Sequence, residues 1–189
     1  MAKRNEEVIS GVKPPVSVYR DKNTIFFYDE LNPDTIYNLE RHMRDIYEGT
    51  RGADHINLVI DSGGGSHGAI YDFLKAFPLP IHGYVKGYCC SGATVMFLGC
   101  MKRFMAPSSL MLIHSYQGPG ADWEKEGSIN DEYNNILRMN ETLRRVYRAE
   151  TKIPPKELDD LIKDRERYLT AEECMKWKII HEIAPYVGV

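Results

Sequence analysis

The chain twice passes from a strand-like segment through a glycine-containing turn into an apolar, helix-like segment. The first passage has a β-branched strand at 56–60 and a glycine turn at 61–66. The second has a strand at 81–85 and a turn at 87–94, which contains Ser91. Because such units bury apolar helices against parallel strands, they predict an α/β fold with crossover helices.

The remaining segments extend this pattern within one domain, since 189 residues fit a single domain. We assign residues 1–23 to an amino-terminal arm that orders only against something else, such as a neighbouring subunit, and 24–189 to the domain. Ser128 with Asp131 predicts a cap for a long helix, and Thr170 with Glu173 predicts a capping box for the last helix. We expect strands at 24–28, 102–107 and 110–114, and helices at 33–49, 129–150 and from 154 onward.

Composition narrows the classes of function. The net charge of −3 is modest and basic residues are scattered among acidic ones, so charge does not indicate nucleic-acid binding. No apolar run approaches the length of a membrane span or resembles a secretory signal, so we expect a cytoplasmic protein without membrane contact. The chain has four cysteines, and their spacing is not that of metal ligands: Cys89, Cys90, Cys100 and Cys174. We therefore expect reduced thiols, and neither a metal nor a cofactor.

Ser91 stands where the second turn enters its helix. A helix start offers unpaired N–H groups, which a serine nucleophile needs beside it to hold an oxyanion. Serine is equally common there as a simple N-cap. His114 ends a strand expected in the same sheet, and Asp164 and Glu166 follow later, so a Ser–His–acid set is one interpretation. A hydrogen-bonded histidine at a strand end is the other.

The glycines of the first turn, 63–65, also have two interpretations. A glycine turn before a helix can hold a phosphate, but neither nucleotide-binding glycine pattern is present. Alternatively, the missing side chains let the backbone approach a substrate peptide closely.

Four segments resemble motifs of the Clp protease proteolytic subunit family (ClpP), whose members are serine peptidases. They occur in the family's order, within a resemblance that runs from Thr24 to Ile183. Residues 60–72 resemble INSPGGS…AIYD, residues 87–93 resemble GQAASMGA, residues 103–114 resemble KRFALPNS…MIH, and residues 164–173 resemble DRDNFLTAEEA.

The resemblance implies a crotonase-like α/β fold, a β-β-α superhelix with a protruding handle helix at about 129–150. It implies a serine endopeptidase that cleaves unfolded proteins and peptides inside two stacked seven-membered rings. Carried over by position, Ser91 is the nucleophile, His114 is the general base, and the N–H groups of Gly65 and Gly92 form the oxyanion hole. The apolar face of the handle helix then packs on its own domain or on the opposite ring.

The third catalytic residue is less simply assigned. The family's triad aspartate aligns with Glu166, whereas Asp164 and Arg165 align with a pair used in contacts between rings. A glutamate can serve in this role, because serine hydrolases with Ser–His–Glu sets exist. We therefore expect Glu166 to orient His114, with Asp164 as the alternative.

Several positions depart from the family pattern. Gly63 replaces a proline, and Asn57 and Val59 replace tyrosines that line the docking pocket for an AAA+ unfoldase ring. These departures fit a divergent member, such as a viral one, and they alter the positions at which an ordinary AAA+ unfoldase would dock. Two other functions stay open: a catalytically impaired structural ring subunit, and an acyl-CoA-handling enzyme on the same fold.

Overall fold

The computed structural model describes residues 17–49, 53–66, 69–118, 127–163 and 167–187. Within these residues, one eight-stranded sheet has the order β1-β2-β3-β4-β5-β8, and β6 pairs with β4 and β7. The strands from β2 to β5, together with β6 and β8, pair in parallel, whereas β1 and β7 are antiparallel to their neighbours. The strands are β1 (Val18–Asp21), β2 (Thr24–Phe27), β3 (Ile56–Ser62), β4 (Ile81–Cys90), β5 (Lys102–Met105), β6 (Leu110–Leu112), β7 (Tyr168–Leu169) and β8 (Glu182–Ile183).

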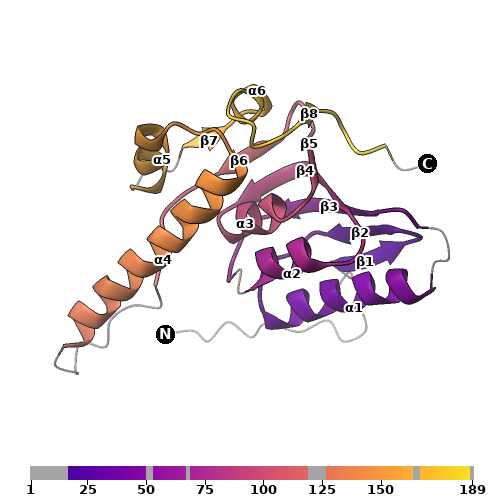
Figure 1. The fold of residues 1–189 in the computed structure, drawn as a ribbon, viewed down its shortest axis with the longest axis horizontal. Coiled ribbons are helices and arrows are strands. Elements are labelled where there is room, and N and C mark those ends of the chain that lie inside the picture. The colour runs from indigo at the N-terminus through magenta and orange to yellow at the C-terminus, as the bar shows by residue number, and fades with distance from the viewer. Residues whose placement is uncertain (1–16, 50–52, 67–68, 119–126, 164–166, 188–189) are drawn as a thin grey trace, which may run out of the picture.

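The helices connect these strands, as the repeated strand–turn–helix pattern predicts. Figure 1 shows α1, α2 and α3 along the sheet, whereas α4 extends away with its amino-terminal end far from the strands. The expected α/β architecture with a protruding helix is thus present. The helices are α1 (Pro33–Gly49), α2 (Ile70–Ala76), α3 (Gly92–Leu98), α4 (Ser128–Glu150), α5 (Pro155–Ile162) and α6 (Ala171–Lys176).

The starts of α1 and α6 are capped by the residues that the sequence predicted. The Asn32 Oδ1 atom accepts hydrogen bonds of 3.0 Å from the Asp34 and Thr35 N–H groups, and Pro33 is the first helical residue. Thr170 and Glu173 form the expected capping box at α6, each side chain accepting from the other residue's N–H group. Side-chain acceptors satisfy N–H groups that a helix start leaves unpaired.

The start of α4 differs from the expectation. The N-cap residue is Gly127, with a φ of 83°, and Ser128 is already the first helical residue. Glycine adopts this left-handed conformation without the steric cost that a side chain would add. The predicted cap by Ser128 with Asp131 is therefore wrong. The N-cap lies one residue earlier, and it is a glycine that makes no side-chain cap bond.

The apolar face of α4 divides into two parts. Leu143 and Tyr147, near the carboxyl end, are buried in the domain core. Ile129, Tyr133 and Leu137, spaced one helical turn apart, are 51%, 61% and 48% exposed. Packing on its own domain therefore accounts only for the carboxyl-terminal half, while the amino-terminal half presents an uncovered apolar strip.

Strand β4 extends five residues beyond the expected end at Val85. Gly87, which suggested a turn, instead makes room for Asp61, because a Cβ at Gly87 would lie 2.5 Å from the Asp61 Oδ2 atom. The Asp61 Oδ1 atom accepts a 2.8 Å hydrogen bond from the Tyr88 N–H group. The added residues of β4 pair with β6, and this pairing brings the segments around Ser91 and His114 to one edge of the sheet.

Strand β1 falls within the predicted amino-terminal arm, 1–23, but belongs to the sheet. Val18 pairs with Phe27 and Asp21 with Thr24, in an antiparallel hairpin. At least residues 18–21 of the predicted arm are therefore part of the domain. Residues 1–16 of that arm lie outside the described residues.

Arg103 of β5 connects the ends of α3 and α4 with the carboxyl-terminal segment. Its side chain is 5% exposed. The Nε atom donates to the Ile179 carbonyl at 2.7 Å, and the two terminal nitrogens donate to the Glu150 carboxylate at 3.2 Å and the Glu150 carbonyl at 2.9 Å. The carbonyls of Leu98 and Cys100, at the end of α3, accept further bonds. One buried cation thus satisfies the carboxyl ends of α3 and α4.

No helix formed by the described residues combines the length and apolar character needed to span a bilayer. The same residues contain no cluster of three or more His, Cys, Asp or Glu side chains suited to holding a metal ion. All four cysteines are buried and unbridged. Burial raises the pKa values of Cys100 and Cys174 to about 12, so these thiols stay protonated at neutral pH.

Candidate active site

Ser91 lies at the junction of β4 and α3 in a strained backbone conformation. Its φ and ψ angles are 52° and −127°, a region that residues other than glycine rarely adopt. The Ser91 N–H group donates a 2.8 Å hydrogen bond to the Leu112 carbonyl of β6. The Ser91 side chain makes no cap bond to α3. The N-cap interpretation therefore does not account for this serine, and its hydroxyl lines a cleft.

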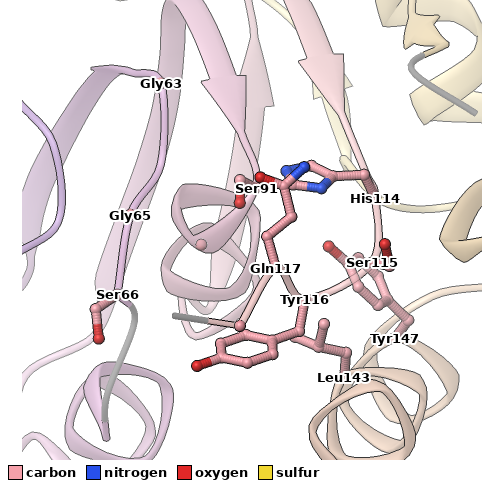
Figure 2. Close-up of a pocket in the computed structure, with 12 residues that line it drawn as sticks. Gly63, Gly65, Ser66, Ser91, His114, Ser115, Tyr116, Gln117, Leu143 and Tyr147 are labelled. Carbon is pink, nitrogen blue, oxygen red and sulfur yellow. The ribbon is translucent and has the colours of Figure 1, made fainter. Parts of the chain in front are cut away.

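His114 reaches the same cleft from the neighbouring strand. Because Cys90 pairs with Leu112 in parallel, the residues after both strands emerge at the same edge of the sheet. The cleft has a volume of about 550 Å³ and both side chains line it. Figure 2 shows Ser91 between Gly65 on one side and His114 on the other. Among the described residues, no hydrogen bond joins the Ser91 and His114 side chains. In serine hydrolases this bond is often long in the free enzyme and shortens when substrate binds.

The glycine turn after β3 lines the cleft on the side of Ser91 that faces away from His114. Gly64 and Gly65 have φ angles of 106° and 118°. A Cβ at Gly64 would lie 2.5 Å from the Cys90 carbonyl oxygen, so the turn packs directly against the Ser91 segment. On its other side the turn pairs with Leu31, whose N–H donates to the Gly64 carbonyl and whose carbonyl accepts from Ser66 N–H. In a parallel pairing of this kind, the Gly65 N–H group faces away from Leu31.

Gly92 supplies a second N–H group at the cleft. It is the first residue of α3, where the N–H groups have no partner within the helix. Gly92 and Gly65 both line the cleft beside Ser91. Two backbone donors next to a hydroxyl and an imidazole form a set that can perform acyl transfer.

The remaining wall comes from α4 and the segment after His114. Leu143 and Tyr147 line the cleft together with Ser115, Tyr116, Gln117 and Gly118. The Tyr116 N–H group donates a 2.7 Å hydrogen bond to the Oδ1 atom of Asn140, a buried residue of α4. Sequence analysis did not single out Asn140, although a polar residue within the apolar stripe of α4 was a signal that could have found it.

The sequence profile of the Clp protease family matches residues 13–186, which is most of the chain. The chain belongs to the Clp protease family. Residue 166, assigned as the third catalytic group of this Clp protease, lies outside the described residues, as do Asp164, Arg165 and positions 119–126 of the loop after His114.

Curated relatives of this Clp protease are distant. The chain is 30% identical over 136 residues to ATP-dependent Clp protease proteolytic subunit 1 of Thermobifida fusca, and 27% identical over 135 residues to subunit 1 of Rhodopirellula baltica. These matches cover 69% and 68% of the chain but only 60% and 57% of the relatives. Subunit 3 of Rhizobium johnstonii is 23% identical over 187 residues, which is 95% of the chain and 92% of that protein.

Solved structures agree on the fold. ClpP1 from Listeria monocytogenes matches with a TM-score of 0.73 and 21% identity, over 88% of the chain and 93% of that structure. A mutant of the same ClpP1 matches with a TM-score of 0.75 and 22% identity, over 87% and 92%. The expected ClpP-type fold is thereby confirmed.

Proposed function

We propose that this Clp protease is a cytoplasmic serine endopeptidase subunit that hydrolyses peptide bonds of unfolded proteins and peptides. The observation that carries the proposal is the cleft shared by Ser91, His114, Gly65 and Gly92. In the proposed reaction, the Ser91 hydroxyl attacks a peptide carbonyl while His114 takes its proton. The Gly65 and Gly92 N–H groups stabilise the oxyanion, and His114 returns the proton to the leaving amine. Water activated by His114 then hydrolyses the acyl ester.

Glu166 completes this mechanism by orienting the His114 imidazole. The position-by-position resemblance supports Glu166 over Asp164, because residue 166 stands where the family's motif has its triad aspartate. The antiparallel pairing of Leu112 with Tyr168 brings β7 beside the strand that leads to His114.

Self-association into two stacked seven-membered rings belongs to the same proposal. The exposed strip of Ile129, Tyr133 and Leu137 supports it, because a solvent-facing apolar helix face is suited to a contact with another copy. An AAA+ unfoldase is proposed as a partner of the rings. Val59 is fully buried and so cannot contact such a partner directly, which is consistent with an altered docking surface.

Peptidase rates of four variants test the mechanism on a short fluorogenic peptide. We expect Ser91→Ala and His114→Ala to lose activity by roughly a thousandfold or more, because each is part of one catalytic unit. Glu166→Ala should lose activity by roughly a hundredfold or more, whereas Asp164→Ala should retain most of it once assembled. Light scattering on each variant separates loss of assembly from loss of chemistry.

Loss only in Asp164→Ala, with assembly intact, would reassign the acid. Assembled rings of the unmodified protein without measurable peptidase activity would instead favour the structural ring subunit.

A further inference from the structure

A buried pair of hydroxyl groups connects α4 to the backbone of Ser91. The Tyr147 hydroxyl of α4 forms a hydrogen bond with the Thr94 Oγ1 atom of α3, and the two residues are 2% and 0% exposed. The Thr94 Oγ1 atom lies 2.6 Å from the Ser91 carbonyl oxygen. Sequence analysis identified neither residue as part of the site, since the contact joins positions 53 apart along the chain.

The direction of each hydrogen bond follows from the number of protons. A carbonyl oxygen can only accept, so Thr94 donates its single hydroxyl proton to Ser91. The Thr94 Oγ1 atom must then accept the proton of the Tyr147 hydroxyl. Burial raises the pKa of Tyr147, so the phenol keeps this proton at neutral pH. The pair therefore forms one directed chain from Tyr147 through Thr94 to the Ser91 carbonyl.

This chain acts on a peptide group that matters for the reaction. The Ser91 carbonyl and the Gly92 N–H group belong to the same planar peptide unit, so fixing one fixes the direction of the other. The unit follows a residue with a φ of 52°, a conformation that persists only where surrounding contacts hold it. The Thr94 N–H group also donates to the Ser91 carbonyl, at 3.0 Å, so that oxygen has two donors from Thr94.

We propose that Thr94 and Tyr147 are positioning residues that hold the Ser91–Gly92 peptide plane, and thereby aim the Gly92 N–H group at the oxyanion. This inference rests on the proposed peptidase function. Neither side chain reacts with the substrate; their contribution is realised when charge develops on the carbonyl oxygen in the transition state. Their loss therefore lowers kcat while KM is little changed.

The experiment compares kcat and KM on a short fluorogenic peptide for Tyr147→Phe, Thr94→Val and Thr94→Ser. We expect kcat to fall roughly tenfold in Thr94→Val and by a smaller factor in Tyr147→Phe, with KM within about twofold. Thr94→Ser keeps the hydroxyl and should stay within about threefold of the unmodified protein. Tyr71→Phe is the matched control, because its hydroxyl donates to Glu150 of the same helix at 2.7 Å but has no link to Ser91.

A double variant, Thr94→Val with Tyr147→Phe, separates positioning from stability. Thr94→Val alone leaves the buried Tyr147 hydroxyl unpaired, whereas the double variant removes both polar groups. We expect the double variant to recover part of the thermal stability lost in Thr94→Val while its kcat stays low. A kcat that recovers together with stability, or a kcat unchanged in Thr94→Val, would overturn the inference.

The outcome for the unmodified protein distinguishes this inference from the proposed function. If the unmodified protein cleaves the peptide and Thr94→Val cleaves it equally well, only the positioning role fails. If the unmodified protein and Tyr71→Phe are both folded and inactive, the peptidase function fails and the positioning role falls with it.

Discussion

At the residue scale, three consecutive glycines before α2 differ in what the fold requires of them. Gly64 and Gly65 have positive φ angles, and a side chain on either would meet backbone atoms at 2.5 Å or less. Gly63 has open space within 4 Å of its missing Cβ and no positive φ. The departure from the family's proline at position 63 is therefore structurally mild, while the next two glycines cannot be exchanged without moving the cleft wall.

The variant Gly64→Ala should destabilise the protein by roughly 2–4 kcal/mol, through backbone strain and a clash with Cys90 and Ser91. The matched control Gly63→Ala should change stability by less than about 1 kcal/mol. Chemical denaturation followed by circular dichroism measures both. Equal stabilities for the two variants would show that the turn is not packed against the Ser91 segment.

Local patterns, a turn before a helix and a strand end, indicated Ser91 and His114, whereas the roles of Gly65 and Gly92 were implied only by the resemblance to the family's motifs. The structure brings all four to one cleft. Thr94 and Tyr147 could not be found this way, since their contact depends on how α3 packs against α4. The number of residues between them carries no information about that packing.

At the element scale, Arg103 connects the ends of α3 and α4 with the carboxyl-terminal segment. Its main partner, Glu150, is also held by Lys75 at 2.8 Å and by the Tyr71 hydroxyl at 2.7 Å. Burial by itself raises the pKa of Glu150, but these hydrogen bonds and the nearby charges of Lys75 and Arg103 bring that pKa below its ordinary value. Glu150 is thus an ionised, partly buried carboxylate that depends on its cationic partners.

Replacing Arg103 with methionine should cost roughly 3–5 kcal/mol of unfolding free energy, because several buried acceptors lose their donor at once. The control Arg44→Met removes an exposed pair with Glu40 and should cost less than about 1 kcal/mol. Urea denaturation of the two variants provides the comparison. A loss for Arg103→Met as small as that for Arg44→Met would contradict the role of Arg103 as a buried link.

Element boundaries were less predictable than the elements themselves. The apolar spacing in α1 and the capping box of α6 are local signals, and both helices lie where expected. The extension of β4 depends on a contact with Asp61 of β3. Strand β1 forms only because it pairs with β2 in a short hairpin. Such boundaries are set by tertiary contacts that a local pattern does not contain.

At the scale of the whole molecule, three histidines link stability to pH: His42 and His82, which are partly buried, and the more exposed His181. The pKa values of His42, His82 and His181 all lie below 6.5, mainly because burial disfavours their charged forms. His181 also accepts a 3.0 Å hydrogen bond from the Arg103 N–H group at its Nδ1 atom, which requires that atom to be unprotonated. Below the ordinary pKa of 6.5, the unfolded chain binds more protons than the folded one.

We therefore expect stability to be fully present above about pH 7 and to decline as the pH falls through about 6.5. The variant His181→Asn keeps a side-chain acceptor but cannot titrate, so its melting temperature should fall less steeply on acidification. Melting temperatures at several pH values from 7.5 to 5.5 test this, taken at one ionic strength. A melting temperature that rises on acidification, or an unaltered slope in His181→Asn, would contradict the account.

The central claim is that the Ser91 hydroxyl is an activated nucleophile, and covalent trapping tests it most directly. A fluorophosphonate reacts with such a serine by forming an Oγ–P bond as fluoride leaves and His114 takes the proton. Intact mass followed by peptide mapping should show one adduct per chain, on Ser91, and none in Ser91→Ala or His114→Ala. A folded, assembled protein that never forms the adduct, or one that labels equally after Ser91→Ala, would contradict the claim.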